Sequence, residues 1–376
     1  MKRASIITGI DVGTSAIRVV VASIEPGKVL PTILAMVQKE SRGLRHGYVT
    51  NSEEAGASIS EVISQAERTA KVKLKGAILS IGGISLSGTC SDGSVAVSRA
   101  DSEINNLDVT RAINASEANL RDTLNRRILH SIPQYFKLDG KKIIGRPQGL
   151  KGTVLEARTL FISCLSQHID DLEEALDNAG VKVEEVVAAP LAESFAVLSK
   201  LQKTAGCVLA NIGAETVSIA VFEDGIPVSL QVFPIGSTDI TNDIALGLKV
   251  SLEEAEKIKR GGEHNAMRKR VDEIIDARLS DIFELIEAHL KKIGRNGLLP
   301  AGIVLTGGGA EIDEADTFAK SALKLPASIA RPRELKDPSW SLAYGLCLMA
   351  GNTEPEETLG IHKLARQTTS SVLGFL

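Results

Sequence analysis

The strongest constraint on this chain is a pattern that occurs twice. Residues 6–22 and 207–222 each contain an apolar strand, a turn with glycine and a second apolar strand. Each unit then passes through another glycine turn into a third apolar stretch, at 29–37 in one and 227–235 in the other. Because similarity at such long range indicates a duplicated unit, the sequence predicts two related halves, each built on a three-stranded meander.

The turns of the two units carry matching polar residues. Asp11 and Gly13 of the first correspond to Asn211 and Gly213 of the second, 200 positions further along the chain. The hydroxyl residues of the same turns are Thr14, Ser15 and Thr216. Glycine at a tight bend lets backbone N–H groups approach an anion, and an acidic residue at the strand end can hold Mg²⁺ through water. One such hairpin is as often an ordinary turn, but two copies favour a clamp for nucleotide phosphates.

A third glycine motif occurs late in the chain. Residues 302–312 (GIVLTGGGAEI) form a short buried-strand pattern that ends in Gly307, Gly308 and Gly309. After these glycines we expect a helix from about Glu311 to Leu323. Glycines between a strand and a helix let a ligand approach the backbone, and a helix N-terminus favours a phosphate or another polar group. Alone, this motif is only a weak indication of nucleotide binding.

A glutamate and a lysine share one face of another expected helix. Residues 251–254 (SLEE) have the pattern of a capping box, and the helix that they open carries Glu256 and Lys259 three positions apart. Such a pair can bracket a ribose or a base. A solvated salt bridge is its commoner meaning.

Size and composition exclude several classes of protein. At 376 residues the chain exceeds what one hydrophobic core usually holds, so at least two domains are expected. The formal net charge is −4 and aromatic residues make up only 3%, which argues against a nucleic-acid partner. The four cysteines and six histidines have no metal-binding spacing, and no apolar stretch is long enough to span a membrane. No export signal is visible, and we expect a cytoplasmic protein.

Apolar residues at helical spacing predict several further helices. The expected ranges are 51–71, 108–122, 169–179, 266–293 and 338–350. The region 84–161 is too long for a structureless loop, so a small subdomain is expected there.

Taken together, these features resemble the actin-like ATPase superfamily, in which ATP lies between two related domains, and within it the FtsA family of bacterial division proteins. The more specific segments are 42–51, 128–140, 147–164, 253–262 and 301–312. The segment 128–140 (ILHSIPQYFKLDG) followed by 147–164 is similar to the FtsA insert called subdomain 1C, which other actin relatives lack.

The resemblance implies an α/β, actin-like (ribonuclease H-like) two-domain ATPase fold with a 1C insert. The implied division is 1–83 and 162–202 as domain 1A, 84–161 as 1C, 203–237 and 301–350 as 2A, 238–300 as 2B, and 351–376 as a linker and partial membrane-targeting tail.

The resemblance also implies ATP and Mg²⁺ as cofactors. Phosphate contacts are expected from Gly13, Thr14, Ser15, Gly213 and Thr216, and Asn211 is expected as a further cofactor-binding residue. Metal organisation is expected from Asp11, and nucleoside contacts from Gly307, Gly308, Gly309, Glu256 and Lys259. Two alternatives stay open, a PilM-like adaptor of type IV pilus assembly and a sugar or polyol kinase, although no convincing catalytic Asp for a kinase is found.

By the same resemblance, the chain polymerises and links FtsZ filaments to the inner face of the cell membrane at the division site, together with other divisome proteins. Subdomain 2B would bind the C-terminal peptide of FtsZ, with Arg278 at a basic contact position. The tail carries His362, Lys363 and Arg366 beside spaced apolar residues, a weak version of a membrane-surface helix.

Two departures from the family pattern bear on hydrolysis. Asn211 stands where an acidic residue is expected, and Glu215 falls where glycine is expected. Ala189 precedes Pro190, a position at which filament-forming relatives that hydrolyse ATP can carry a water-polarising Glu. We therefore expect ATP to be bound firmly and hydrolysed slowly or not at all.

Overall fold

The fold was analysed in a computed structural model of the chain, which describes residues 5–25, 30–261, 268–330, 332, 335 and 337–351. The expected linker and tail beyond Gly351 lie outside these residues. The chain divides into two compact units. The first combines the described parts of Met1–Leu86 and His168–Asn352, and the second comprises Ser87–Gln167.

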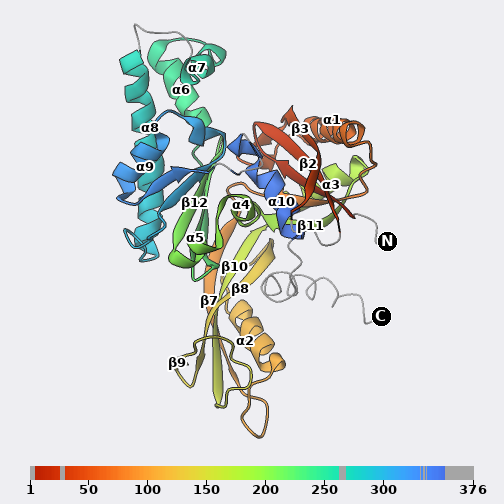
Figure 1. Cartoon of the computed structure of the whole chain (residues 1–376), viewed down its shortest axis with the longest axis vertical. Helices are drawn as coiled ribbons and strands as arrows, with labels where there is room; N and C mark the ends of the chain where they lie inside the picture. Colours follow the sequence, from red (N-terminus) through yellow and green to blue (C-terminus); the bar gives the residue numbers. More distant parts are fainter. Residues whose placement is uncertain are drawn as a thin grey trace. The chain divides into compact units, whose positions relative to one another are not determined.

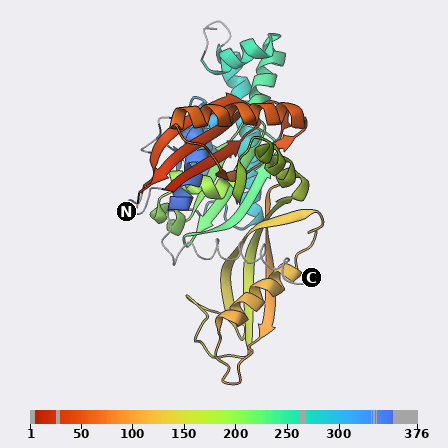
Figure 2. The same ribbon diagram turned by 90° about the vertical axis from the view of Figure 1, so that its right-hand side faces the viewer.

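The first half of the larger unit is a five-stranded sheet with the order β11-β6-β1-β2-β3. Its strands are β1 (Ser5–Val12), β2 (Ala16–Ile24), β3 (Thr32–Glu40), β6 (Gly76–Ile81) and β11 (Lys182–Ala188). Strands β1 to β3 form an antiparallel meander, and β6 and β11 add in parallel. Helix α1 (Ser52–Ala70) packs against β2 and β3, as Figure 2 shows.

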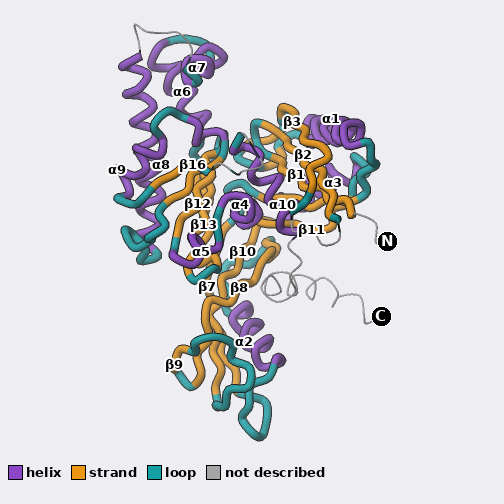
Figure 3. Tube along the Cα trace, in the orientation of Figure 1, coloured by secondary structure: helices purple, strands orange, loops and turns teal. Residues whose placement is uncertain are grey.

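The second half repeats this topology with the order β14-β13-β12-β15-β16. Its strands are β12 (Cys207–Ile212), β13 (Val217–Glu223), β14 (Ile226–Phe233), β15 (Ile303–Thr306) and β16 (Ala327–Ile329). Again the first three form an antiparallel meander and the last two run parallel to β12. The expected pair of related halves is confirmed, and in Figure 3 the strands of each half are flanked by helices.

The helices of the second half carry its apolar core. They are α6 (Ser237–Leu248), α7 (Leu252–Lys259), α8 (Arg268–Lys292) and α9 (Ala315–Leu323), with α6 and α7 near one end of α8 (Figure 1). One face of α8 is buried, including Leu279, Ile282, Phe283 and Ile286. The apolar spacing that predicts this helix is therefore core packing over its described part.

Helices α4 (Ala189–Val197) and α10 (Ser341–Gly351) cross at very short range. A Cβ atom at Gly345 would collide with the carbonyl of Ala192, and one at Gly9 with the carbonyl of Ala343. Glycine at both positions is therefore required for α10 to pack on β1 and α4. Trp340, in the 3₁₀ turn Pro338–Trp340 before α10, packs against the neighbouring core.

The remaining elements of the larger unit are short. They are β4 (Leu44–Arg45), β5 (Tyr48–Val49), α3 (Ser166–Asn178), which starts at the border of the smaller unit, and α5 (Lys200–Ala205). The helix expected at 51–71 is confirmed, because the Asn51 side chain caps α1 by accepting from Glu53 and Glu54 N–H, and Lys71 ends it in a left-handed conformation.

The smaller unit is a four-stranded sheet with one helix. The strands lie in the order β7-β10-β8-β9, with β7 (Ser87–Ala96), β8 (Arg126–Leu138), β9 (Lys141–Lys142) and β10 (Val154–Leu165). Helix α2 (Asn106–Ala118) packs on β7 and β10, close enough that a Cβ at Gly93 would collide with the Ser116 backbone. Residues 84–161 therefore contain a folded region with its own core, centred on Ile104, Ile113 and Leu155.

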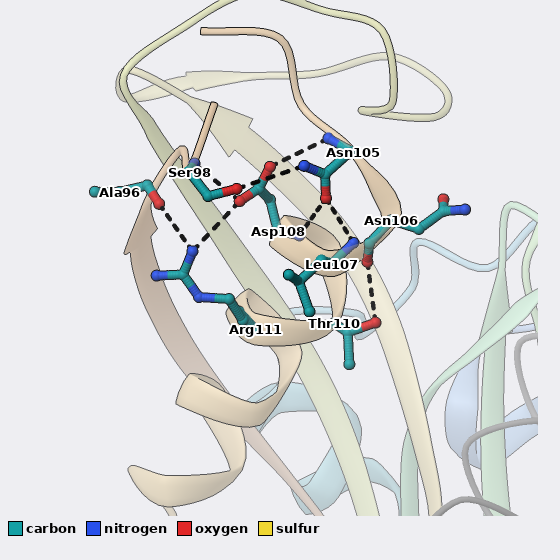
Figure 4. A network of polar contacts seen from close by, with 8 residues as sticks. All are labelled: Ala96, Ser98, Asn105, Asn106, Leu107, Asp108, Thr110 and Arg111. Atoms are coloured by element: carbon teal, nitrogen blue, oxygen red, sulfur yellow. Dashed lines mark hydrogen bonds and ion pairs between the residues drawn. The ribbon is translucent and has the colours of Figure 1, made fainter. Parts of the chain in front are cut away.

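A helix forms in this region as expected, but the predicted bounds of 108–122 are wrong. Asn105 caps it, because its Oδ1 accepts from the N–H groups of Leu107 at 2.7 Å and Asp108 at 3.1 Å. The Asp108 carboxylate accepts in return from Asn105 N–H at 3.2 Å, as Figure 4 shows. Asp108 is thus the third helical residue and not the start, and the helix ends at Ala118.

Candidate functional site

The two hairpins predicted to hold phosphate have the same turn geometry. Gly13 N–H donates to the Ala16 carbonyl at 3.1 Å, and Gly213 N–H donates to the Thr216 carbonyl at 2.9 Å. A Cβ at Gly13 or Gly213 would lie 3.0 or 2.9 Å from the same carbonyl oxygen. Both turns therefore favour glycine for the same reason, and the correspondence read from sequence holds at the level of single hydrogen bonds.

The first hairpin presents a carboxylate and two hydroxyl residues. Asp11 accepts from the Ser80 hydroxyl at 3.1 Å, and burial raises the pKa of Asp11 against the opposing effects of Arg18 and this bond. Thr14 Oγ1 accepts from Gly47 N–H at 3.1 Å, and Ser15 is exposed at the turn. The hairpin can thus offer an acidic ligand to a cation and hydroxyl donors to an anion.

The glycine run packs directly on the second hairpin. A Cβ at Gly307 would lie 2.5 Å from Asn211 Oδ1 and 2.6 Å from the Ile212 carbonyl, and Gly307 has a φ of +82°. A Cβ at Gly309 would collide with the Ile212 side chain. Gly308, by contrast, is exposed and has no atom within 4 Å of its Cβ position. The run therefore leaves open space only at its middle residue.

The helix predicted from Glu311 to Leu323 starts later than expected. Residues Gly308–Glu311 form a 3₁₀ turn, and α9 begins at Ala315. The tight contacts of the glycines with β12 hold the chain in this turn before it can enter an α-helix. An α-helix N-terminus immediately after the glycines is thus not available to a ligand.

The Glu256 and Lys259 pair forms a compact polar group on α7. Lys259 Nζ lies 2.6 Å from Glu256 Oε2 and donates to Thr241 Oγ1 at 2.8 Å, and Thr241 donates to Glu256 at 2.6 Å. Burial works against ionisation, but hydrogen bonds from Lys259, Thr241 and Arg260 lower the pKa of Glu256 to about 2. The pair is therefore ionised and held in place.

A chain of backbone contacts links this pair to the second hairpin. Lys259 donates to the Ser237 carbonyl at 3.0 Å. Ser237, the first residue of α6, donates through its N–H to the Gly213 carbonyl at 2.9 Å, and Thr238 N–H donates to the Ala214 carbonyl at 2.8 Å. The Glu256 and Lys259 pair is thus joined through α6 to the hairpin around Gly213.

Glu193 is the residue that sequence reasoning missed. It lies on α4 with 1% of its surface exposed. Asn211 Nδ2 donates to both of its carboxylate oxygens, at 3.0 and 2.9 Å, and Thr306 Oγ1 donates to Oε1 at 2.9 Å. The sequence signal for Glu193 is an acidic residue inside the apolar run 186–198.

Burial makes Glu193 a weak acid. Loss of solvent raises its pKa from 4.5 to about 7, although the bonds from Asn211 and Thr306 oppose the change. The charge of Asp11 raises the pKa further, and Arg18 lowers it. Glu193 thus shares an electrostatic environment with the first hairpin while contacting the ends of two strands of the second half.

Glu215, which falls where glycine is expected, makes its contacts outside its own turn. Its carboxylate accepts from His46 N–H at 2.6 Å and pairs with Arg45 at 3.0 Å. Since Gly47 of the same β4–β5 hairpin contacts Thr14, this hairpin connects the two glycine turns.

The site contains no ready-made metal cage. Within the described residues, no group of three or more His, Cys, Asp or Glu side chains is arranged to hold a metal ion. Mg²⁺ is usually held by one or two carboxylates, waters and substrate phosphates and not by a protein cage. Asp11 and the oxygen of Asn211 fit this type of donor set.

Arg278 lies away from the hairpins, on α8. Its guanidinium donates to Asp243 Oδ2 at 2.8 and 2.6 Å and pairs with Asp281 at 3.2 Å, and 28% of its side chain is exposed. A carboxylate of a binding partner would have to share the Arg278 guanidinium with Asp243 and Asp281, or displace them.

None of the helices in the described part of the chain has the length and apolar run needed to span a bilayer.

Family comparisons match most of the chain. The model "Cell division protein FtsA" matches residues 208–345, and the model "SHS2 domain inserted in FTSA" matches residues 83–163. FtsA of Borreliella burgdorferi is 35% identical over 375 residues, covering 92% of this chain and 90% of that protein. FtsA of Pseudomonas aeruginosa is 28% identical over 372 residues, covering 91% and 88%.

Solved structures share the fold at low identity. A chain of the PilM–PilN type IV pilus biogenesis complex superposes with a TM-score of 0.70 at 17% identity, covering 92% of this chain and 98% of that one. MreB5 of Spiroplasma citri bound to ADP gives a TM-score of 0.55 at 13% identity, with 97% and 98% covered. The expected actin-like fold with an inserted subdomain is confirmed.

Replacing Glu193 by Gln tests the buried carboxyl group. A pKa raised from 4.5 to about 7 means that this group stabilises the fold below pH 4.5 and loses that contribution as the pH rises through 7. Glutamine does not ionise, so the stability of Glu193→Gln relative to wild type should rise by about 2 kcal/mol between pH ~5.5 and ~8. Thermal unfolding of the nucleotide-free protein measures this. An equal Tm difference at both pH values would show that Glu193 does not titrate in this range.

Proposed function

Since the chain belongs to the FtsA family of cell division proteins, we propose that it binds ATP with Mg²⁺ between its two halves, polymerises and links FtsZ to the membrane surface. The observation that carries the nucleotide site is the duplicated turn, in which Gly13 and Gly213 make the same hydrogen bond. A structural neighbour, MreB5, is by its title bound to ADP, which supports the proposal.

In this proposal each hairpin contacts phosphate and the glycine run lies beside the nucleoside. Gly13, Thr14 and Ser15 act from the first hairpin, and Asn211, Gly213 and Thr216 act from the second. Asp11 organises Mg²⁺ through water, and Gly307, Gly308, Gly309, Glu256 and Lys259 contact the nucleoside. When bound, Mg²⁺ neutralises charge on the phosphates.

Membrane attachment is proposed from the sequence of residues 352–376, which lie outside the described part of the chain. The basic residues His362, Lys363 and Arg366 suit an anionic surface, and the apolar segment 372–376 (VLGFL) is short. A contact this small holds a protein firmly only when many copies act together on a polymer. Filament formation and membrane attachment are therefore coupled in this proposal, at the inner face of the membrane and with other divisome proteins.

A valine at Gly308 tests the nucleotide position. No atom lies within 4 Å of the Cβ position at Gly308, so the fold tolerates the substitution, whereas a ligand beside the glycine run would meet the new side chain. We expect ATP to bind at least about 10-fold more weakly to Gly308→Val, measured by titration calorimetry. Gly56→Val on α1 is the matched control, because its Cβ position is equally open. Equal affinities for both variants would refute the assignment.

ATP should be bound but turned over slowly. Ala189 brings no general base, and the Glu193 carboxylate is buried and already accepts from Asn211 and Thr306. Loss of a positioned base typically lowers a rate by about 10²–10⁴-fold. Single-turnover assays with radiolabelled ATP and Mg²⁺ measure the rate, with Asp11→Ala as the control for metal dependence. Phosphate release at several per minute that Asp11→Ala abolishes would contradict this reading.

Arg278 should contribute to binding of the FtsZ C-terminal peptide. Reversing its charge beside Asp243 and Asp281 would disturb the fold as well as the peptide, so the sharper variant is the neutral pair Arg278→Gln with Asp243→Asn. We expect this pair to weaken peptide binding by about 1–3 kcal/mol, measured by fluorescence anisotropy.

The control for this experiment lies on the same helix. Lys291→Glu breaks an exposed pair with Glu287 and should leave the affinity unchanged. Wild-type affinity in the neutral pair would remove Arg278 from the peptide site, and tighter binding of a pilus-protein peptide would favour the PilM-like alternative.

A further inference from the structure

The two hairpins differ in charge at corresponding positions. In the first, Asp11 lies opposite Arg18 on the neighbouring strand, and in the second, Asn211 lies opposite Ser218. The second hairpin therefore has two neutral residues where the first has an acidic and a basic one. A clamp that is symmetric in backbone geometry is asymmetric in charge.

A carboxylate from another element stands beside the neutral position. Glu193 comes from α4, which follows β11 of the first half, and its oxygens lie 2.9 and 3.0 Å from Asn211 Nδ2. Thr306, at the end of β15, donates to the same carboxylate at 2.9 Å. A buried carboxylate needs such donors, and here two strand ends next to the glycine turns supply them.

These bonds determine which end of the Asn211 amide faces the glycine turns. Both carboxyl oxygens of Glu193 accept from Asn211 Nδ2, so the NH₂ group of the amide is directed toward Glu193. Its carbonyl oxygen Oδ1 then points the other way. That oxygen lies 2.5 Å from a Cβ position at Gly307 and 3.9 Å from one at Gly213.

We propose that Glu193 is a positioning residue for the nucleotide site: its carboxyl group accepts from the Asn211 NH₂ group and so holds the amide with Oδ1 facing the glycine turns, where the Mg²⁺ and phosphate group would bind. The proposal rests on the proposed function. In the second hairpin the Asn211 amide stands at the position that the Asp11 carboxylate has in the first. Its hydrogen bonds to Glu193 polarise the amide, so that Oδ1 becomes a stronger acceptor.

The test transfers the carboxyl group from position 193 on α4 to position 211 on β12. Wild type is compared with Glu193→Gln, Asn211→Asp and the double variant, and the affinity for ATP is measured with Mg²⁺ and with EDTA. Glu193→Gln should lose about 10-fold of the Mg²⁺-dependent gain in affinity, because its amide no longer fixes the orientation of Asn211. Asn211→Asp alone faces two carboxylates toward each other and should also bind poorly.

The double variant separates positioning from simple packing. With Asp at 211 and Gln at 193, the Gln NH₂ can donate to one Asp oxygen while the other faces the metal, so the Mg²⁺-dependent gain should return to within about 3-fold of wild type. Glu223→Gln is the matched control, since its carboxylate pairs with Arg295 at 2.7 Å in the same half. A double variant as weak as Glu193→Gln would overturn the proposal.

A second readout needs no nucleotide. In ¹⁵N spectra of the nucleotide-free protein, the Asn211 side-chain NH₂ signal, assigned by its loss in Asn211→Asp, should exchange slowly with water in wild type and faster in Glu193→Gln. Equal exchange in both would overturn the orientation argument. A double variant that stays weak beside a wild type that binds ATP with Mg²⁺ would overturn only this inference, whereas a wild type that binds no ATP would overturn the proposed function as well.

Discussion

The buried carboxylate of Glu193 is the contact on which the arrangement of the site depends. It receives hydrogen bonds from Asn211 and Thr306, which end two adjacent strands of the second half, while α4, which carries it, continues directly from a strand of the first. A carboxylate so deeply buried is costly to leave without donors, so these strand ends are held at fixed positions relative to α4. The close packing of α10 on α4, which Gly345 permits, supports the same helix.

The duplicated architecture could be predicted because its signals are local. A strand, a glycine turn and a second strand lie within about twenty residues, and the hydrogen bond across each turn involves positions three apart, Gly13 with Ala16 and Gly213 with Thr216. The same holds for α1, where Asn51 caps the helix through residues two and three positions ahead. Features fixed by short-range contacts can be read from a single sequence.

Features that depend on contacts between distant residues could not be predicted from the sequence. The partners of Glu193 lie 18 and 113 positions away, and the acidic partner Asp243 of Arg278 lies 35 positions away. The late start of α9 depends on contacts of the glycine run with Ile212, almost a hundred residues earlier. Composition and periodicity carry no information about such long-range pairs. The sequence indicates one of them only through Glu193, a single acidic residue in an apolar run.

Divergence between the two halves is consistent with different tasks for the two hairpins. The first keeps Asp11 with Arg18 opposite, so its charge sits on the strand beside a fixed counter-charge. The second has neutral residues on the strand, and its Asn211 is hydrogen-bonded to a carboxyl group from α4, an element outside its own sheet. A ligand that contacts Asn211 therefore also contacts, through one hydrogen bond, the helix between the two sheets. The first hairpin influences the same helix through charge, because ionised Asp11 raises the pKa of Glu193.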